Sequence, residues 1–588
     1  MATGGTIVTA LKGGAWLIEP TQPASVLTPE KLTDEHRLIA RTTEEFVNQE
    51  AVPALPRLEE HDWALARALL KRCGELGLLG IDVPEEYGGL ALDKVTSLIV
   101  SEHMSKSASF GATFGAQANL TVLPLMLFGT DAQKQKYLPK LLSGEIVGAY
   151  CLSETGSGSD ALGAKTKASR QADGSFVLNG EKMWTTNGGF ADVFIVFAKV
   201  DGEQFSCFIV ERAFGGVTSG KEEHKMGLHG SSTTAVILQD VRVPAENLLG
   251  EVGKGHKVAF NVLNFGRFKL GGMCAGGCRD AIGESARYAA QRKQFGQPIA
   301  SFGAIKHKLG EMIARTYAVE SLLYRTAGMI DERIGDAKNG ATAAAVLEEY
   351  AVEASIAKVA GSETLDFVLD ENIQIHGGNG FVRDYPAERH YRDARVNRIF
   401  EGTNEINRLL IPGMLARRAV KGDVGIIPAA KALQDELLGP PSLPSADDEP
   451  LGEERRAVES FKKIALMVFG VAMQTYGAKL ADQQEILTFT ADILIDVYSA
   501  ESAWLRATSS QHGPRGQLHA DAARVFINDA SGRIEIAARN ALASMASGDT
   551  LRTMLAGLRR LSKFVPVDTV TMRRRLADEA VARGGYVF

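Results

Sequence analysis

The stretch Asp192 to Val200, DVFIVFAKV, indicates the fold, because β-branched and aromatic residues dominate it. Two similar stretches follow, Phe205 to Val210 (FSCFIV) and Thr234 to Val243 (TAVILQDVRV), and Gly-rich turns such as Asn187-Gly188-Gly189 separate such runs. Short runs of this composition between glycine turns are typical of β-strands. Residues 149–257 are therefore predicted to form an antiparallel β domain.

Apolar residues at helical spacing lie on both sides of this β domain. Leu65 and Leu69 share one helix face before it, and Val258 and Val262 do so after it. A stretch rich in Pro, Ser and acidic residues near 437–455 cannot supply a buried face. The predicted fold class is α+β, mostly α, with a leader (1–27), an N-terminal helical domain (28–148), the middle antiparallel β domain (149–257), a helix bundle (258–418), a linker (419–455) and an appended all-helical domain (456–588).

The composition of the 588 residues is that of a soluble globular protein, with 45% hydrophobic residues and a net charge of −6. This net negative charge gives no electrostatic reason to bind nucleic acid, whose phosphates proteins contact with clustered Lys and Arg. No nucleic-acid partner is therefore expected. The five cysteines are too scattered for a disulfide framework, and Cys274 and Cys278 are interpreted as packed thiols. The longest apolar run, Ile464 to Met473, is about half as long as a membrane-spanning helix. With no export signal recognised, a cytoplasmic bacterial location is expected.

Several standard catalytic motifs do not occur in the sequence, namely HExxH, the P-loop and the GxSxG elbow. The run from Gly156 to Ala161 (GSGSDA) matches a loose dinucleotide fingerprint, but β-patterned sequence follows it instead of a crossover helix. Two interpretations of this run stay open. It is either a surface turn or a set of backbone N–H groups open to a diphosphate or a flavin edge, with Ser153 and Ser159 as added donors.

Glu401 precedes Gly402-Thr403-Asn404-Glu405, a pattern typical of a loop that enters a helix, with Thr403 or Asn404 as the N-cap. The Glu401 carboxylate either complements the helix dipole or stands ready to accept a proton. In the second case, a ligand that excludes water would raise its pKa.

Two further runs are ambiguous on their own. His376-Gly377-Gly378-Asn379-Gly380 is interpreted as a sharp turn between helices. Arg392, Arg395 and Arg398 form either a phosphate patch or salt bridges at helix ends.

Six sequence blocks, in this order, resemble the acyl-CoA dehydrogenase family over about residues 30–418. The blocks are Ala149 to Asp160 (AYCLSETGSGSD), Gly180 to Gly189 (GEKMWTTNGG), Lys225 to Thr233 (KMGLHGSST), Arg292 to Gly296 (RKQFG), Gln374 to Gly380 (QIHGGNG) and Ile399 to Glu405 (IFEGTNE). The extra C-terminal domain, the NFGR motif at Asn264 to Arg267 and Glu401 together resemble the very-long-chain branch, which is dimeric.

This resemblance implies a noncovalent FAD between the β domain and the helix bundle. The residues implied to line the flavin from its own subunit are Tyr150, Leu152, Ser153, Gly158, Ser159, Trp184 and Thr186. Those implied to contact the FAD of a neighbouring subunit are Arg292, Phe295, Gln374, Gly377 and Gly378, and Thr403 and Glu405 complete the cofactor site. The implied assembly is a homodimer.

The implied reaction is α,β-dehydrogenation of an acyl-CoA thioester to trans-2-enoyl-CoA, with long-chain substrates of β-oxidation favoured. Glu401 would take the α proton while the β hydrogen leaves as hydride to flavin N5, and the Glu401 backbone N–H would stabilise the thioester oxygen. Electrons would pass to an electron-transferring flavoprotein that docks near Trp184. The implied substrate contacts are Ser159, Asn264, Arg267 and Gly402, and Arg267 would also orient the base loop.

Three regions are compared with the family pattern: the position of Gly266, the flavin loop and the pocket floor. Some members carry the base at the position of Gly266, which cannot serve, so Glu401 is the predicted base. The flavin loop has Ser153-Glu154-Thr155 in place of Thr-Glu-Pro, and the missing proline loosens the predicted turn. Thr121 and Pro124 replace pocket-floor glycines and are expected to shorten or bend the acyl channel.

Two alternatives to the dehydrogenase stay open: an acyl-CoA oxidase that uses oxygen, and an interaction protein for respiratory-complex assembly with residual activity. Weak peripheral contact with a membrane through the C-terminal domain is also weighed, by way of Ile464 to Met473 or the basic run 572–575. A packed helix and a solvated face are the competing interpretations of these two features.

Overall fold

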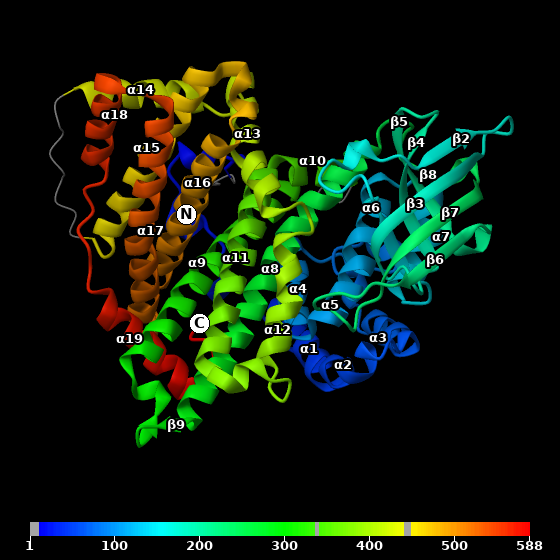
Figure 1. The fold of residues 1–588 in the computed structure, drawn as a ribbon, viewed down its shortest axis with the longest axis horizontal. Coiled ribbons are helices and arrows are strands. Elements are labelled where there is room, and N and C mark those ends of the chain that lie inside the picture. The colour runs from blue at the N-terminus through cyan, green and yellow to red at the C-terminus, as the bar shows by residue number, and fades with distance from the viewer. Residues whose placement is uncertain (1–10, 336–339, 440–448) are drawn as a thin grey trace, which may run out of the picture.

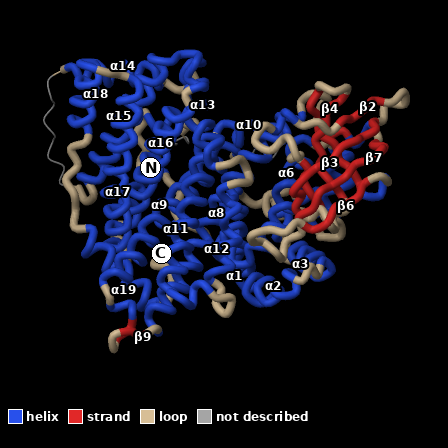
Figure 2. The backbone as a smooth tube through the Cα atoms, in the orientation of Figure 1, coloured by secondary structure: helices blue, strands red, loops and turns tan. Residues whose placement is uncertain are grey.

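The computed structural model describes residues 11–335, 340–439 and 449–588. Helices make up most of the chain, and the strands of the main sheet gather at one end of the molecule (Figure 1). Figure 2 shows the same division, with only the short β9 strand labelled at a distance from that sheet. The predicted fold class is confirmed, because N-terminal helices, a β domain, a helix bundle and further C-terminal helices follow one another along the chain.

The N-terminal helices begin at polar residues that cap them. Thr33 Oγ1 accepts a hydrogen bond from His36 N at 3.2 Å, and Thr130 Oγ1 accepts one from Gln133 N at 3.2 Å. The helices are α1 (Asp34–Phe46), α2 (Val52–Glu59), α3 (Trp63–Glu75), α4 (Lys94–Met104), α5 (Ala108–Gly115), α6 (Val122–Phe128) and α7 (Asp131–Leu142). A π-helical segment, Ala116–Thr121, joins α5 to α6.

The β domain is a mixed sheet. Its strands are β1 (Gly148–Cys151), β2 (Lys167–Arg170), β3 (Phe176–Thr186), β4 (Val193–Val200), β5 (Gln204–Glu211), β6 (Val217–Glu222), β7 (Thr233–Val243) and β8 (Leu248–Leu249). The strand order is β6-β7-β3-β2-β4-β5-β8, with β1 against β4. Most pairs are antiparallel as predicted, but β1 and β2 pair with β4 in parallel. β4, with which β1, β2 and β5 all pair, is buried along nearly its whole length.

Two layers of helices follow the sheet. The bundle contains α8 (Gly255–Gln291), α9 (Gly303–Ile334), α10 (Gly340–Glu349), α11 (Ala351–His376), α12 (Ala387–Ala394) and α13 (Asn404–Lys421), with a small hairpin of β9 (Lys293–Gln294) and β10 (Gln297–Pro298). The C-terminal helices are α14 (Ile426–Leu438), α15 (Gly452–Tyr476), α16 (Gln484–Ser510), α17 (Gly516–Met545), α18 (Gly548–Leu561) and α19 (Thr569–Arg583).

The predicted linker 419–455 needs a correction, because α14 occupies Ile426–Leu438 within it and packs against α15. Pro428 lies in the first turn of α14, where a missing N–H costs no helical hydrogen bond. Residues 440–448, the centre of the predicted linker, lie outside the described residues.

Two hydrophobic cores replace the predicted series of separate domains. One core joins the N-terminal helices to the sheet, for example through Phe110 and Phe194. The other joins the bundle to the C-terminal helices and to the leader, for example through Leu322, Tyr498 and Trp16. The C-terminal helices therefore complete the core of the bundle.

One helical segment of the described chain, Gly452–Asp482, is long and apolar enough by composition to cross a membrane, and 44% of its most apolar window is buried. Phe461, Ile464 and Phe469 of this segment lie in the core that α15 shares with α16 and α17. The basic run is also engaged, because Arg573 pairs with Glu311 and Arg575 with Asp521. Both features considered for membrane contact thus make intramolecular contacts.

A buried chain of ion pairs connects the layers. Arg506 of α16 is 1% exposed, and it donates to Glu320 of α9 at 2.6 Å and to Glu30 near the N-terminus at 2.6 Å. Arg279 of α8 continues the chain, since it donates to Glu320 at 3.2 Å and to Glu102 of α4 at 3.0 Å. The alternating charges fix α4, α8, α9 and α16 relative to one another.

Removal of Arg506 is expected to destabilise this assembly. Arg506→Ala leaves Glu320 and Glu30 without a shared partner inside the protein, and loss of one partner of a buried pair costs about 3–5 kcal/mol. Urea unfolding followed by circular dichroism measures the change. Arg552→Ala, which removes an exposed arginine, is the control and should leave the midpoint unchanged. Equal midpoints for both variants would contradict the assigned role of Arg506.

Candidate active site

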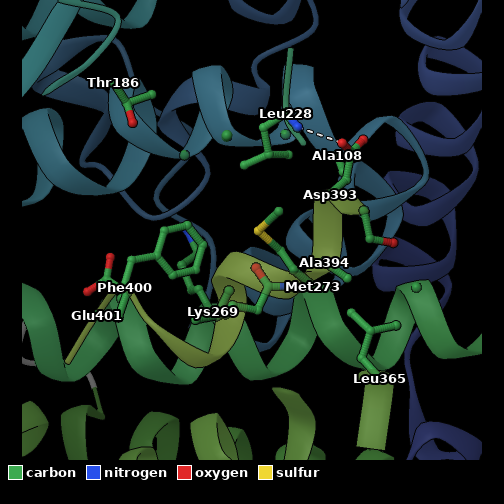
Figure 3. A pocket seen from close by; sticks show the side chains of 18 of the residues that line it. Ala108, Thr186, Leu228, Lys269, Met273, Leu365, Asp393, Ala394, Phe400 and Glu401 are labelled. Carbon is green, nitrogen blue, oxygen red and sulfur yellow. Dashed lines mark hydrogen bonds between the residues drawn. The ribbon is translucent and has the colours of Figure 1, made fainter. Parts of the chain in front are cut away.

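The main pocket lies where the two cores meet. Its walls come from α5 and the adjoining π-helical segment, from α8 and α11, and from α12 and the loop before α13. Figure 3 shows Glu401 and Phe400 at one end of the pocket, with Ala108, Asp393 and Leu365 toward the other end. The lining between them is mainly apolar, including Met273 and Leu270.

Glu401 sits on a strained loop that polar contacts hold in place. Its φ is 57°, a left-handed value that is rare for residues other than glycine, asparagine and aspartate, and Gly402 follows with φ 80°. Arg267 Nε donates to the Glu401 backbone oxygen at 3.0 Å, and Lys358 Nζ donates to the Gly402 oxygen at 2.8 Å. Thr403 caps α13 as predicted, because its Oγ1 accepts from Ile406 N at 3.2 Å.

The Glu401 carboxyl itself is left without partners. Its Oε2 atom is buried and accepts no hydrogen bond from the described residues. Desolvation raises its pKa to about 7, although the charges of Arg267 and Lys358 oppose the shift. A carboxylate with this pKa and a free oxygen at a pocket end suits a general base at neutral pH.

Gly266 of α8 provides the space for this carboxyl. A Cβ at position 266 would lie 2.9 Å from Glu401 Oε2, which is closer than real side chains approach. Beside it, Arg267 and Asn264 are both buried, and Arg267 Nη1 donates to Asn264 Oδ1 at 3.1 Å. The structure therefore brings Gly266, Arg267, Asn264, Glu401 and Gly402 together.

A loop of the β domain forms a second part of the site. Glu154 fixes residues 152–160, since it accepts hydrogen bonds from Lys182 Nζ at 2.7 Å, Lys165 N at 2.6 Å and Thr166 Oγ1 at 2.6 Å. These bonds hold the loop although the family proline is missing at Thr155. Within it, Gly158 and Ser159 are exposed, and a Cβ at Gly158 would meet nothing within 4 Å.

Residues near this loop also present groups suited to a ligand. The Tyr150 hydroxyl is buried without a partner among the described residues, and burial raises its pKa, with the charge of Glu401 adding to the shift. Thr186 lines the main pocket, whereas Trp184 is 58% exposed at φ 53°. Leu152 and Ser153, which precede Glu154, are half-buried.

The remaining predicted cofactor residues form a separate patch. Arg292 is about 37 Å from Arg267 along α8, as judged by the helical rise. Tyr288, one turn before Arg292, stacks on His376 at 4.1 Å, and this contact brings the hairpin to the turn after α11. The exposed members of the patch are Arg292, Phe295, Gln374, Gly377 and Gly378. A single chain does not bring this patch to Glu401.

The structure corrects the predicted pocket floor. Thr121 and Pro124 are buried but do not line the pocket. Small residues of α5 and the π-helical segment line it instead, namely Ala108, Gly111, Ala112, Gly115 and Ala116. Sequence reasoning missed Lys358, whose charge acts on Glu401, and Lys269, which lines the same pocket, because no short motif surrounds either lysine.

Several smaller interpretations are now decided. Cys274 and Cys278 are buried thiols, and burial raises the pKa of Cys274 to about 12. Arg392 pairs with Glu388 and Arg398 with Asp366, which favours salt bridges for these two, whereas Arg395 Nη1 is buried without a partner among the described residues. The run after His376 is a turn, with Gly377 at φ 61°.

Models of protein families match nearly the whole of this architecture. Residues 33–145, 149–241 and 253–415 match the N-terminal, middle and C-terminal domains of acyl-CoA dehydrogenases, and residues 460–560 match a further acyl-CoA dehydrogenase C-terminal domain. The chain belongs to the acyl-CoA dehydrogenase family. The last match places residues 460–560, from α15 to α18, within a domain that is itself described for acyl-CoA dehydrogenases.

Individual relatives agree with this assignment. A probable acyl-CoA dehydrogenase of Bacillus subtilis (strain 168) is 48% identical over 96% of this chain and 97% of its own length. The mitochondrial very long-chain specific acyl-CoA dehydrogenase of Homo sapiens is 42% identical over 63% of this chain and 56% of its own length. A crystal structure of an acyl-CoA dehydrogenase complexed with FAD from Bacillus anthracis has a TM-score of 0.96 at 48% identity, and the match covers 98% of this chain and 100% of that one.

Gly266→Ala is expected to lower kcat/KM for acyl-CoA by up to about 100-fold, because the new methyl group would push the Glu401 carboxyl out of position. Steady-state kinetics with an artificial electron acceptor measures the loss. Gly413→Ala in α13, where an added Cβ would meet nothing within 4 Å, is the control. Undiminished activity of Gly266→Ala would show that the contact is not needed.

Proposed function

We propose that this protein is an FAD-dependent acyl-CoA dehydrogenase that converts long-chain acyl-CoA thioesters to trans-2-enoyl-CoA in fatty acid β-oxidation. The observation that carries the proposal is the buried Glu401 carboxyl, which has an unpartnered oxygen and a pKa of about 7 at the end of an apolar pocket. The family membership and the full-length match to an FAD complex support the cofactor.

The residues present fit FAD. Two buried polar atoms, Tyr150 Oη and Glu401 Oε2, have no partner among the described residues, and the charge of Glu401 acts on Tyr150. The loop at Gly158 leaves its backbone open to a ligand. The same-chain residues that would hold the flavin are Tyr150, Leu152, Ser153, Gly158, Ser159, Trp184, Thr186, Thr403 and Glu405. When bound, FAD supplies the two-electron acceptor for the β hydrogen.

Glu401 removes the α proton in this proposal. The α C–H of a thioester is weakly acidic, so the charge that forms on the thioester oxygen needs stabilisation. The Glu401 backbone N–H donates no hydrogen bond within the described residues and is available for that oxygen. Arg267 holds the loop through the Glu401 carbonyl, which leaves the carboxylate free to act as the base.

A mainly apolar pocket holds the acyl chain in this proposal. Leu270, Met273, Leu365 and Leu369 surround its middle, so the reacting carbons lie in an apolar environment. The α8 stripe from Gly266 to Asp280 spans about 21 Å. The small residues of α5 on the facing wall leave this length open.

A second copy of the chain completes the cofactor site. Arg292, Phe295, Gln374, Gly377 and Gly378 lie at the opposite end of α8 from Glu401 and are exposed, with Phe295 at 92%. In a homodimer these groups contact the FAD of the partner. In this proposal an electron-transferring flavoprotein docks near Trp184, and the 58% exposure of that side chain supports this location.

Glu401→Gln is expected to retain FAD and to lose anaerobic bleaching of the flavin by acyl-CoA, with a rate at least about 100-fold lower. Stopped-flow absorbance at the flavin band measures this rate. Because the carboxylate is the active form and its pKa is about 7, kcat/KM of the native enzyme should fall about tenfold per unit below pH 7 and level off above it. Glu535→Gln, on the exposed face of α17, should match the native enzyme. Normal bleaching by Glu401→Gln would rule out this base.

Ala112→Phe is expected to shift the preference toward short chains, because Ala112 lines the pocket wall. Its neighbour Gly111 lies next to Met273 of α8, since a Cβ at Gly111 would be 3.1 Å from Met273 Cε. The ratio of kcat/KM for long over short acyl-CoA should fall by roughly tenfold or more. Thr121→Ser, outside the lining, is the control and should keep the native ratio. An unchanged ratio in Ala112→Phe would place the acyl chain elsewhere.

A further inference from the structure

The far end of the acyl pocket differs chemically from its middle. Beyond the apolar stretch, the lining contains Asp280, His390, Asp393 and Lys106. Figure 3 shows Asp393 with Ala108 and Leu365 at this end, away from Glu401. The end of a long acyl chain would therefore meet ionisable side chains.

Asp280 lies on the same stripe of α8 as the groups around the base. Gly266, Met273, Gly277 and Asp280 recur at spacings of seven, four and three residues, and all line the pocket. These spacings keep them on one helix face. Asp280 is half-buried at the last position of this stripe that the pocket reaches.

The other ionisable groups at this end have partners of their own. Asp393 Oδ1 accepts from Leu228 N at 2.5 Å, and His390 Nδ1 pairs with Glu284 at 3.4 Å. Lys106 is exposed and donates to Asn48 Oδ1 at 2.7 Å. Within the described residues, Asp280 accepts no hydrogen bond and forms no ion pair.

The electrostatic surroundings of Asp280 contain charges of both signs. Burial raises the pKa of its carboxyl, with Glu284 adding to the shift, while Lys106, Arg279 and His390 oppose it. Arg279 is already engaged with Glu102 and Glu320, and His390 with Glu284. Asp280 is thus the ionisable group at this end that is free to receive a hydrogen bond from a ligand.

We propose that Asp280 makes the far end of the pocket selective for acyl-CoA chains that end in a neutral hydrogen-bond donor, such as an ω-hydroxyl group, over chains of equal length that end in a carboxylate. The donor satisfies the Asp280 carboxylate, whereas a terminal carboxylate meets like charge. This inference rests on the proposed dehydrogenase function and names the substrate class that the same site favours.

The test compares three matched sets of acyl-CoA thioesters, with methyl, ω-hydroxyl and ω-carboxyl ends, over a series of even chain lengths. For chains long enough to reach Asp280, the native enzyme should show kcat/KM about tenfold or more higher for ω-hydroxyl than for ω-carboxyl substrates. Asp280→Asn, which removes the charge and leaves the size of the side chain unchanged, should lower this ratio by about tenfold and leave short methyl-ended substrates unaffected.

Lys106→Ala provides the contrasting variant, because Lys106 is the exposed cation of the same end. The native selectivity should persist in Lys106→Ala. A native preference for ω-carboxyl chains that Lys106→Ala removes, or a ratio that Asp280→Asn leaves unchanged, would overturn the assignment of Asp280. Normal turnover of methyl-ended substrates in those cases keeps the proposed function intact, whereas no turnover of any thioester by the FAD-loaded native enzyme would refute the proposed function itself.

Discussion

The site depends on one constraint, which is that the Glu401 carboxyl is buried without a neutralising contact. Arg267 acts on it through its charge, but the hydrogen bonds of its guanidinium go to the Glu401 backbone carbonyl and to Asn264. A direct ion pair would lower the pKa of the carboxyl, whereas the observed contact positions the loop and leaves desolvation as the largest effect. Gly266 makes this possible, because any side chain there would occupy the space of the carboxyl. The space left by Gly266 in α8 therefore determines where the Glu401 carboxyl lies, and with it the burial that raises the pKa of that carboxyl.

This arrangement costs stability locally, and the rest of the fold offsets it. An unpaired buried polar group and a non-glycine residue at φ 57° each cost about 1–3 kcal/mol. The loop is held by contacts from two helices, through Arg267 of α8 and Lys358 of α11. Those helices are packed on each other and on α9, and the chain of ion pairs through Glu320 and Arg506 ties α8 and α9 to the C-terminal helices. The C-terminal helices thus support α8 and α11, the two helices that hold the strained Glu401 loop.

Local patterns predicted the elements better than the way they pack. The β-branched run at 193–200 forms β4, and the Thr403 cap forms as expected, because strand composition and capping are properties of neighbouring residues. The two shared cores could not be predicted this way, since contacts such as those of Trp16 with Tyr498 join distant parts of the chain. The predicted pocket floor was wrong, because Ala112 and Ala116 line the pocket and Thr121 and Pro124 do not. Which face of this segment meets α8 is decided by contacts between parts of the chain that are far apart in the sequence, and no local pattern specifies them.

The length of α8 explains why one helix can govern both rate and selectivity. Its stripe from Gly266 to Asp280 carries the space for the base at one end and an unpaired carboxyl at the other, with apolar residues between. Since the helix is rigid, the distance between these two ends is fixed, and a chain of a given length places its terminal group at a defined turn. The remaining residues of α8 lead to Arg292, about 37 Å from Arg267, so the exposed patch around Arg292 lies far from Glu401. The same helix therefore sets both the depth of the pocket and the separation of Glu401 from that patch, so a change in its length would disturb both together.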